Sequence, residues 1–293
     1  MSGAPLEVRV QASGQTDVGR VRQHNEDAFV IADLTSGDVG GNSVTVSVTV
    51  GERGVLLGVS DGMGGAQAGD VASTLVVDSL RAHLGDGSNW AAIQDSMKIA
   101  VEKANHDVWN AAQTEGRRGM GATLTAVLVH RSYAYFASVG DSRAYLIRNG
   151  FIRQVTKDQS YVELLVASGA ITREQAETSA HRNVILQAMG QKPTISVALG
   201  RLELRRGDIF LICSDGLSGK VKELDMLGAA LGAPSFAAGC SRLVSLANAR
   251  GGEDNITVVL ARVDGEGLPL ALEEETLSKT FEPIHEYDPL KAK

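Results

Sequence analysis

The sequence predicts two β-sheets that pack on each other and are covered by helices. Many short segments are rich in β-branched and aromatic residues, and longer stretches between them have the apolar spacing of helices. The strand-like segments follow one another too closely for a regular alternation of strand and helix, which argues against a doubly wound parallel sheet. Glycine, with 33 residues, exceeds its usual share of about 7%, which indicates many tight turns.

The expected strands are short and either apolar throughout or alternating. They cover residues 8–13, 43–50, 55–60, 123–130, 133–139, 143–147, 208–214 and 255–263. The expected helices cover residues 66 to 84, 90 to 113, and 221 to 249, the last with a break near Gly232 and Pro234.

One domain is expected over residues 1–264. Within it, residues 156–193 indicate short helices and loops, which either cover a site as a flap or simply connect two strands. After residue 264 the chain has acidic clusters and no clear apolar period, so residues 265–293 are predicted to form a disordered tail.

Composition excludes several classes of function. The net charge is −7 and no run of Lys and Arg suits nucleic acid or an anionic membrane. The first residues lack the pattern of a signal peptide, and no apolar stretch approaches the length of a membrane span, so a cytoplasmic protein is expected. Two cysteines, Cys213 and Cys240, are too few for a disulfide framework.

Acidic residues recur where an apolar strand meets a loop. Ends of strands that are distant in sequence can share one rim of a sheet, and carboxylates gathered there raise each other's pKa unless a cation neutralises them. Oxygen ligands suit Mg²⁺ or Mn²⁺, and the six histidines show no zinc-type spacing. A metal site is therefore predicted from Glu26, Asp27, Asp61, Asp141, Asp215 and Asp254. For Asp141 alone, a tight hairpin turn is the alternative.

The stretch Ser-Asp-Gly occurs twice, at residues 60–62 and 214–216. Gly62 and Gly216 lack a Cβ atom, which would let a backbone carbonyl or a water approach an ion closely. Two divalent ions bridged by one carboxylate lie about 3.5–4 Å apart and lower the pKa of a shared water, which suits phosphoryl hydrolysis without a protein nucleophile. Arg22 could place its guanidinium on the phosphate, with an ordinary surface arginine as the alternative.

Five motifs in order resemble one known family. RVRQHNED (20–27), SDGMGG (60–65), GDSR (140–143), SDGLS (214–218) and EDNITVV (253–259) closely resemble the metal-dependent Ser/Thr protein phosphatases of the PPM (type 2C) family. The resemblance covers residues 8 to 263, and RNVILQAMG is similar to the bacterial branch. It implies two antiparallel sheets packed as a sandwich and flanked by helices on both sides, with the metal ions in a cleft at one end.

The resemblance also implies roles for individual residues. Asp61 corresponds to the ligand that bridges two Mn²⁺ or Mg²⁺ ions, Gly62 to a ligand through its backbone carbonyl, and Asp215 and Asp254 to the remaining direct carboxylates. In the outer part of the site, Asp27 and Glu26 correspond to acidic residues that act through bound water, and Asn255 stands beside Asp254. Asp141, with Asp215, corresponds to a third, weaker ion site of bacterial relatives. Arg22 corresponds to the phosphate-binding arginine, and residues 156–193 to the flap.

Three features depart from the family pattern. Met63 stands where many eukaryotic members have a histidine that is proposed to protonate the leaving oxygen, and a thioether cannot donate a proton. Gln159 stands where bacterial relatives often have a histidine in the flap. Residues 43–54 are longer than the usual connection, and an extended hairpin at a sheet edge is expected there, with a partner-binding strand as the alternative.

The predicted function is hydrolysis of phosphoserine and phosphothreonine on proteins by water or hydroxide between two metal ions. The expected partners are phosphorylated proteins, including a bacterial Ser/Thr kinase that the enzyme opposes, and the chain is expected to be a monomer. The alternative is an inactive module that binds phosphoproteins on the same fold, but such relatives typically lose ligand aspartates that this chain retains. A nucleotide-binding loop at residues 62–69 is disfavoured, because Gln67 replaces the third glycine and Asp61 would repel a pyrophosphate.

Overall fold

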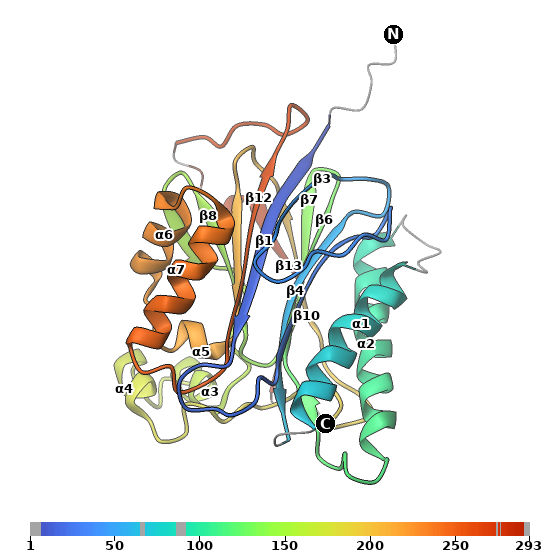
Figure 1. Cartoon of the computed structure of the whole chain (residues 1–293), viewed down its shortest axis with the longest axis vertical. Helices are drawn as coiled ribbons and strands as arrows, with labels where there is room; N and C mark the ends of the chain where they lie inside the picture. Colours follow the sequence, from blue (N-terminus) through green and yellow to red (C-terminus); the bar gives the residue numbers. More distant parts are fainter. Residues whose placement is uncertain (1–6, 65–67, 86–91, 274, 276, 290–293) are drawn as a thin grey trace.

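The predicted sandwich is present in the computed structural model of the chain, which describes residues 7–64, 68–85, 92–273, 275 and 277–289. Its strands form two sheets that pack face to face, and helices lie against the outer face of each sheet (Figure 1). The pairs between the named strands are antiparallel, as in Asp27–Asp33 against Val55–Met63. The fold class expected from the sequence is confirmed.

The first sheet has six strands in the order β3-β1-β12-β11-β8-β9. Their bounds are β1 Arg9–Asp17, β3 Thr45–Thr49, β8 Arg143–Arg148, β9 Phe151–Gln154, β11 Ile209–Cys213 and β12 Ile256–Asp264.

The second sheet has seven strands in the order β13-β10-β7-β6-β4-β2, with β5 paired to β4. Their bounds are β2 Asp27–Asp33, β4 Val55–Met63, β5 Gly121–Ala122, β6 Leu124–His130, β7 Tyr133–Val139, β10 Ala198–Glu203 and β13 Phe281–His285.

The apolar runs of the strands follow from burial on both faces. Successive side chains of a strand point to opposite faces. In β4, Leu57 and Val59 therefore lie in the core between the sheets, whereas Leu56 packs in the core beneath the helices. A strand covered on both sides is apolar throughout rather than alternating, which explains the run that precedes Asp61.

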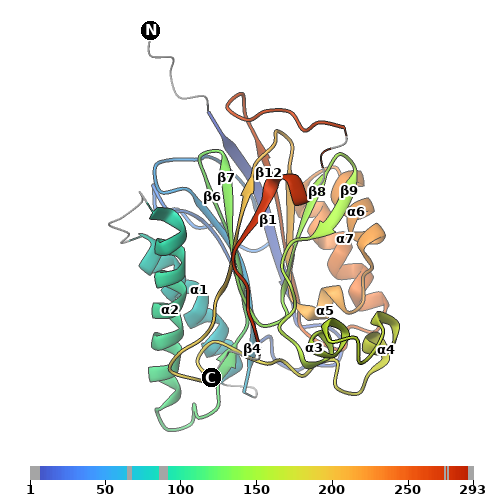
Figure 2. The ribbon, with the colours of Figure 1, turned by 180° about the vertical axis from the view of Figure 1, so that it is seen from behind.

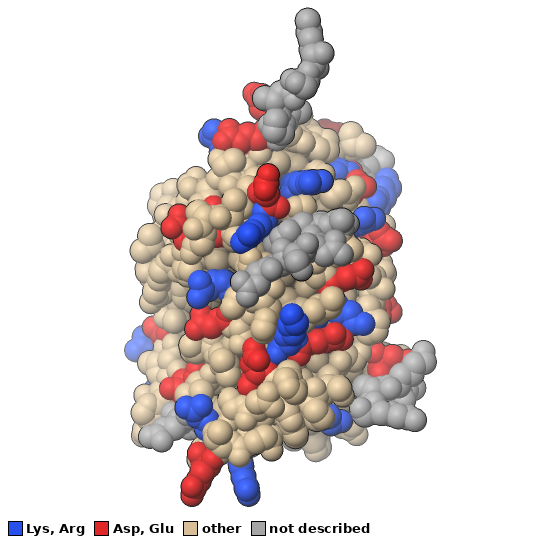
Figure 3. Space-filling model, turned by 90° about the vertical axis from the view of Figure 1, so that its right-hand side faces the viewer, with Lys and Arg blue, Asp and Glu red and all other residues tan. Residues whose placement is uncertain are grey.

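Two pairs of helices cover the sheets. Helices α1 (Gly69–Gly85) and α2 (Ile93–Ala112) cover the second sheet, and on their outer face acidic and basic side chains are interspersed (Figure 3). Helices α6 (Glu223–Gly232) and α7 (Phe236–Ala249) cover the first sheet. The predicted break is confirmed, because α6 ends at Gly232 and the Ser235 side chain caps α7 by accepting from the Ala238 N–H.

Five strands lie outside the ranges expected from the sequence: β2, β5, β9, β10 and β13. β5 and β9 are short, with two and four residues, and β2, β9 and β13 lie at sheet edges. The expected edge at residues 43–54 is confirmed as β3, but β3 pairs with β1 rather than forming a hairpin with its chain neighbours. Its residues alternate between exposed and half-buried, as expected for an edge strand.

The flap segment contains the short helices that the sequence indicates. They are α3 (Tyr161–Ala167), capped by the Ser160 hydroxyl, and α4 (Arg173–Thr178), which begins with a capping box between Thr172 and Gln175. Both lie at the end of the sandwich where α5 (Asp215–Ser218) follows β11 (Figure 1). The flap therefore stands beside the strand ends.

The expected disordered tail is wrong for the described part of residues 265–293. A short helix, α8 (Leu277–Thr280), leads into β13, which pairs with β10 at the sheet edge (Figure 2). Phe281 packs edge-on against Phe136, with the ring centroids 6.0 Å apart. Glu275 lies between Arg148 and Arg205. Composition misled here because a few side chains anchor an otherwise polar segment.

Candidate metal centre

Two of the predicted ligands lie opposite each other on neighbouring strands. Asp27 begins β2, Asp61 lies near the end of β4, and the antiparallel register pairs these two residues directly. Side chains of directly paired residues point to the same face and have Cβ atoms about 4.5–5.5 Å apart. Strand pairing therefore brings the two carboxylates together.

The other sheet brings two more carboxylates to this end of the sandwich. Asp215 begins α5 directly after β11, and Asp254 lies just before β12. The Ser214 hydroxyl joins the two sheets here, because it donates to Asp27 Oδ2 at 2.7 Å and accepts the Thr257 N–H at 3.0 Å. The strand ends of both sheets thus share one rim.

Asp141 lies where the chain crosses from one sheet to the other. It follows β7 of the second sheet and precedes β8 of the first, so the hairpin alternative is wrong. Thr123 ties this crossing to Asp61. Its hydroxyl accepts the Asp61 N–H at 3.0 Å and lies 2.8 Å from the Ser142 hydroxyl.

The carboxylates raise one another's pKa. Burial and then the charges of Asp27, Asp215, Asp141 and Asp254 hold the pKa of Asp61 well above its ordinary value. Burial also raises the pKa of Asp27 to about 7, and that of Asp141 to about 8 with a contribution from Asp215. The pKa of Asp215 is raised by burial and by Asp254. Such a cluster is stabilised by cations.

Two carboxylate oxygens support this interpretation. Asp27 Oδ1 and Asp215 Oδ1 are buried and have no hydrogen-bond partner among the described residues, and buried polar atoms in proteins normally have one. In the described part of the chain, no three His, Cys, Asp or Glu side chains have a geometry that would hold an ion by themselves. Mg²⁺ usually takes only one or two carboxylates and keeps several waters. The donor set therefore fits hard divalent cations that are bound partly through water.

The two glycines of the Ser-Asp-Gly stretches are required by backbone packing. A Cβ atom on Gly62 would lie 2.1 Å from the Gly69 carbonyl oxygen and 2.4 Å from that of Glu26. A Cβ atom on Gly216 would lie 1.9 Å from the Asn255 carbonyl oxygen. The close contact of neighbouring segments is thus one reason for these glycines, and the closer access for an ion that the sequence suggests stays a prediction.

Asn255 holds the loop that carries Arg22 and Glu26. Its Oδ1 accepts the Glu26 N–H at 2.8 Å, and its Nδ2 donates to the carbonyl oxygens of Val18 and His24. Arg22 lies at the exposed mouth of the site and donates to Asp254 Oδ2 at 2.9 Å. Burial raises the pKa of Glu26. Asn255 is thus a positioning residue, and Arg22 stands beside a carboxylate of the cluster.

Met63 and Gln159, two of the three departures from the family pattern, have separate surroundings. The Met63 sulfur lies 3.3 Å from Gln191 Nε2, at the return of the flap. Gln159 is buried, and its Oε1 accepts the Gly140 N–H at 2.8 Å while its Nε2 donates to the Ser138 carbonyl oxygen. Gln159 therefore supports the turn that carries Asp141.

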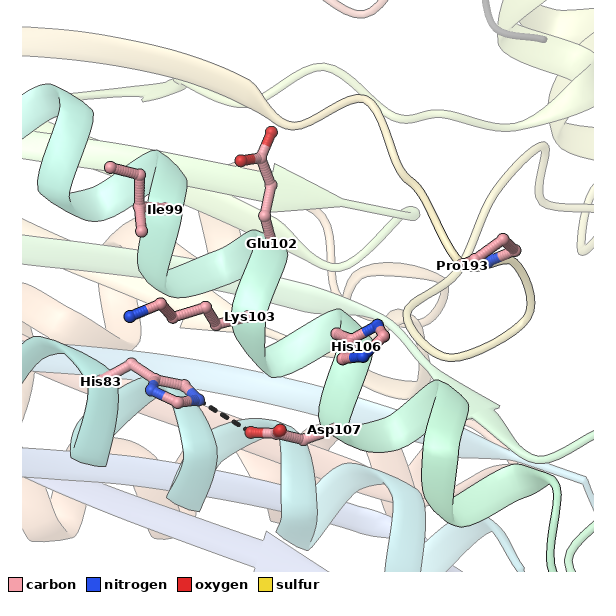
Figure 4. Close-up of a pocket in the computed structure, with 7 residues that line it drawn as sticks. All are labelled: His83, Ile99, Glu102, Lys103, His106, Asp107 and Pro193. Carbon is pink, nitrogen blue, oxygen red and sulfur yellow. Dashed lines mark hydrogen bonds and ion pairs between the residues drawn. The ribbon is translucent and has the colours of Figure 1, made fainter.

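A hollow of about 320 Å³ on the outer surface of α1 and α2 is a separate feature (Figure 4). His83 Nε2 lies 2.8 Å from Asp107 Oδ2 there, and His106 lies on the same helix as Asp107. None of the predicted metal ligands lines this hollow. It is therefore not part of the carboxylate cluster.

Comparison with known proteins agrees with the geometry. The sequence profile described as Protein phosphatase 2C matches residues 43–261. The chain belongs to this family. The serine/threonine protein phosphatase PstP of Mycobacterium tuberculosis is 39% identical over 257 residues, which cover 86% of this chain and 44% of PstP. The serine/threonine phosphatase stp of Listeria monocytogenes is 33% identical, over 87% of this chain and 96% of stp.

A solved structure shows the same fold as this protein phosphatase 2C chain. It is the catalytic domain of PstP in complex with two manganese ions, with 35% identity and a TM-score of 0.73 over 88% of this chain and 99% of that domain. The chain thus spans less than half of full-length PstP and nearly all of its catalytic domain. No described helix has the length and apolar character needed to cross a membrane.

Two residues that support this carboxylate cluster were not predicted from the sequence. They are Ser214, which bonds Asp27, and Thr123, which holds Asp61. The signal for Ser214 was the repeat itself, because the serine of each Ser-Asp-Gly ties its strand end to a neighbour. Ser60, the first of the pair, donates to the Thr123 carbonyl oxygen at 2.6 Å. Thr123 itself has no distinguishing sequence context.

Proposed function

We propose that the chain is a protein-serine/threonine phosphatase that uses two Mn²⁺ or Mg²⁺ ions. Asp61, the Gly62 carbonyl, Asp215 and Asp254 would hold the pair, with Asp27 and Glu26 acting through water. Asp141, with Asp215, would hold a third ion. The observation that carries this proposal is the convergence of mutually repelling carboxylates from both sheets, two of which have buried oxygens without a partner among the described residues. Family membership supports it.

When bound, the metal ions would lower the pKa of a water and polarise the phosphate. The protein's own residues would place the reactants. Arg22 stands at the mouth of the site, where its guanidinium can leave Asp254 for the oxygens of an entering phosphate. Asn255 fixes the loop that carries Arg22, and Thr123 fixes Asp61. No side chain is required as nucleophile.

Phosphorylated proteins are the proposed substrates, as the names of the relatives suggest, and a Ser/Thr kinase is the proposed opposing partner. We further propose a monomer that acts in the cytoplasm.

The deciding experiment is hydrolysis of a phosphothreonine peptide by the full chain with Mn²⁺, with Mg²⁺ or with EDTA. We expect turnover with either metal and none with EDTA. Phosphate release that persists in EDTA would overturn the proposed mechanism. Saturable peptide binding with no turnover in any metal would instead support the inactive binding module.

A second experiment concerns the proton for the leaving oxygen. Met63 cannot supply it, so the task falls to a water held near Asp141. We expect Asp141→Asn to lower kcat for a phosphothreonine peptide by about 10²-fold, the usual worth of a general acid. The same change should alter kcat for p-nitrophenyl phosphate little, because nitrophenolate leaves without a proton. Equal losses on both substrates would contradict this role.

A further inference from the structure

A second cavity, of about 330 Å³, lies between the flap and the C-terminal segment. Helix α3 forms one wall, strands β7 and β10 form another, and residues 281–289 close the third side. Figure 2 shows this C-terminal segment (red) beside the chain that leads into α3. The predicted metal ligands do not line the cavity. Its volume lies within the usual range for small-molecule sites, about 300–1,000 Å³.

Several apolar and aromatic side chains line this cavity. Phe136, Leu164, Leu199 and Phe281 are among the residues that line it. Gly200 lets the Phe281 ring lie against β10, because a Cβ atom there would come within 2.4 Å of the ring. Aromatic rings offset or edge-on to one another gain stabilisation beyond their buried area. An aromatic ligand is therefore favoured over an aliphatic one.

The charges of the lining disfavour an anion. Asp158 is paired with Arg143, at 2.7 Å between Asp158 Oδ2 and Arg143 Nη2, and Glu163 is paired with Arg173. Glu286 and Asp288 add negative charge from the C-terminal segment. Among the described lining residues, Lys157 is the only Lys or Arg. A ligand would therefore be neutral or cationic.

The floor of the cavity connects to the turn that carries Asp141. Gln159 lines the cavity, its N–H donates to the Gly140 carbonyl oxygen at 2.9 Å, and its side-chain oxygen accepts the Gly140 N–H. The Leu186 N–H donates to the Gln159 carbonyl oxygen, so both ends of the flap meet at this residue. A molecule in the cavity would contact the flap, the C-terminal strand and Gln159 together.

We propose that this cavity is a binding site for a small aromatic molecule that carries no negative charge. Binding holds α3 and the base of the flap against the C-terminal segment, at a place separate from the carboxylate cluster. The proposal does not depend on phosphatase activity, because it concerns different residues.

The test uses two fluorescent probes with the same ring system. N-phenyl-1-naphthylamine is neutral, whereas 8-anilino-1-naphthalenesulfonate adds a sulfonate. With the full chain we expect saturable emission from the neutral probe, with a Kd on the order of 10 µM, and affinity for the anionic probe lower by about tenfold or more. A neutral probe that shows no saturable binding, or that binds no better than the anionic one, would overturn the proposal.

A matched pair of variants locates the binding. Ala167→Trp places an indole into the cavity from the end of α3, and we expect it to weaken binding of the neutral probe by about tenfold or more. Val166→Trp adds the same side chain at the adjacent position, which does not line the cavity, and should bind as the wild type does. Equal affinities of the two variants would place the probe elsewhere.

Hydrogen exchange provides a readout that does not depend on a variant. The neutral probe should slow amide exchange in Tyr161–Ala167 and Phe281–His285, the two segments that it bridges, and leave exchange in α2 unchanged. Slowing in α2 alone would contradict the site.

Discussion

Asp61→Asn should abolish most phosphatase activity while the protein remains folded. Asp61 is paired with Asp27 across β2 and β4, and burial and then the carboxylates around it raise its pKa. An amide is isosteric but carries no charge to hold two cations. Groups that stabilise charge at a transition state are each worth on the order of 10²–10³ in kcat, so we expect a loss of about a thousandfold on a phosphothreonine peptide. Steady-state kinetics with saturating Mn²⁺ measure it.

The thermal stability of the variant separates lost chemistry from lost structure. Without metal, Asp61→Asn removes a charge that its neighbours repel, so Tm should be unchanged or higher than that of the wild type. The increase in Tm on adding Mn²⁺ should shrink, because at a given Mn²⁺ concentration weaker binding to the folded state gives less stabilisation. Asp107→Asn, on α2 outside the cluster, is the control and should retain full activity. A wild-type response of Asp61→Asn to Mn²⁺ would contradict its role as a ligand.

Arg148→Met should destabilise the fold by about 3–5 kcal/mol, the usual effect of removing one partner from a buried ion pair. The Arg148 side chain is 6% exposed and donates to both oxygens of Asp208 at 2.7 Å. It also donates to Thr280 Oγ1 at 2.8 Å and lies 3.5 Å from Glu275 Oε2. The variant leaves two buried carboxylates without this guanidinium. Urea unfolding monitored by circular dichroism measures the difference.

Arg201→Met is the matched control for this prediction. Arg201 also pairs with the C-terminal segment, at 2.6 Å from Glu282, but the two side chains are 38% and 61% exposed. Exposed pairs contribute about 0–1 kcal/mol, so a small effect is expected. If both variants unfold at the same urea concentration, the ion pairs of Arg148 with Asp208 and Glu275 do not hold the C-terminal segment in place.

Much of the site could be predicted from sequence because its chemistry is local. Each ligand candidate stands at a junction of an apolar strand and a loop, and the two Ser-Asp-Gly stretches marked two of these junctions. The repeat marks Ser214, but its partners Asp27 and Thr257 could not be predicted, because they are distant in the chain. The direct pairing of Asp27 with Asp61 likewise follows from strand register, which the sequence alone does not specify.

Residues 265–293 show the opposite case, in which the local sequence pattern wrongly predicts disorder. Their acidic clusters and lack of period are typical of disorder. In the structure, Phe281 packs on Phe136, and Glu275 pairs with the buried Arg148 and the half-buried Arg205. These contacts join residues 70 or more positions apart. Phe281 also lines the cavity beside the flap, so this cavity could not be predicted from the sequence.

By itself the sequence determined the sandwich of sheets and helices, the break between α6 and α7, and the acidic residues at strand ends. These depend on periodicity, capping and residue chemistry, which act over a few neighbouring residues. Only the tertiary structure decided which carboxylates face one another, why Gly62 and Gly216 must lack a Cβ atom, and where residues 277–285 lie. Those features depend on the close approach of segments distant in sequence, which is set by sheet register and packing.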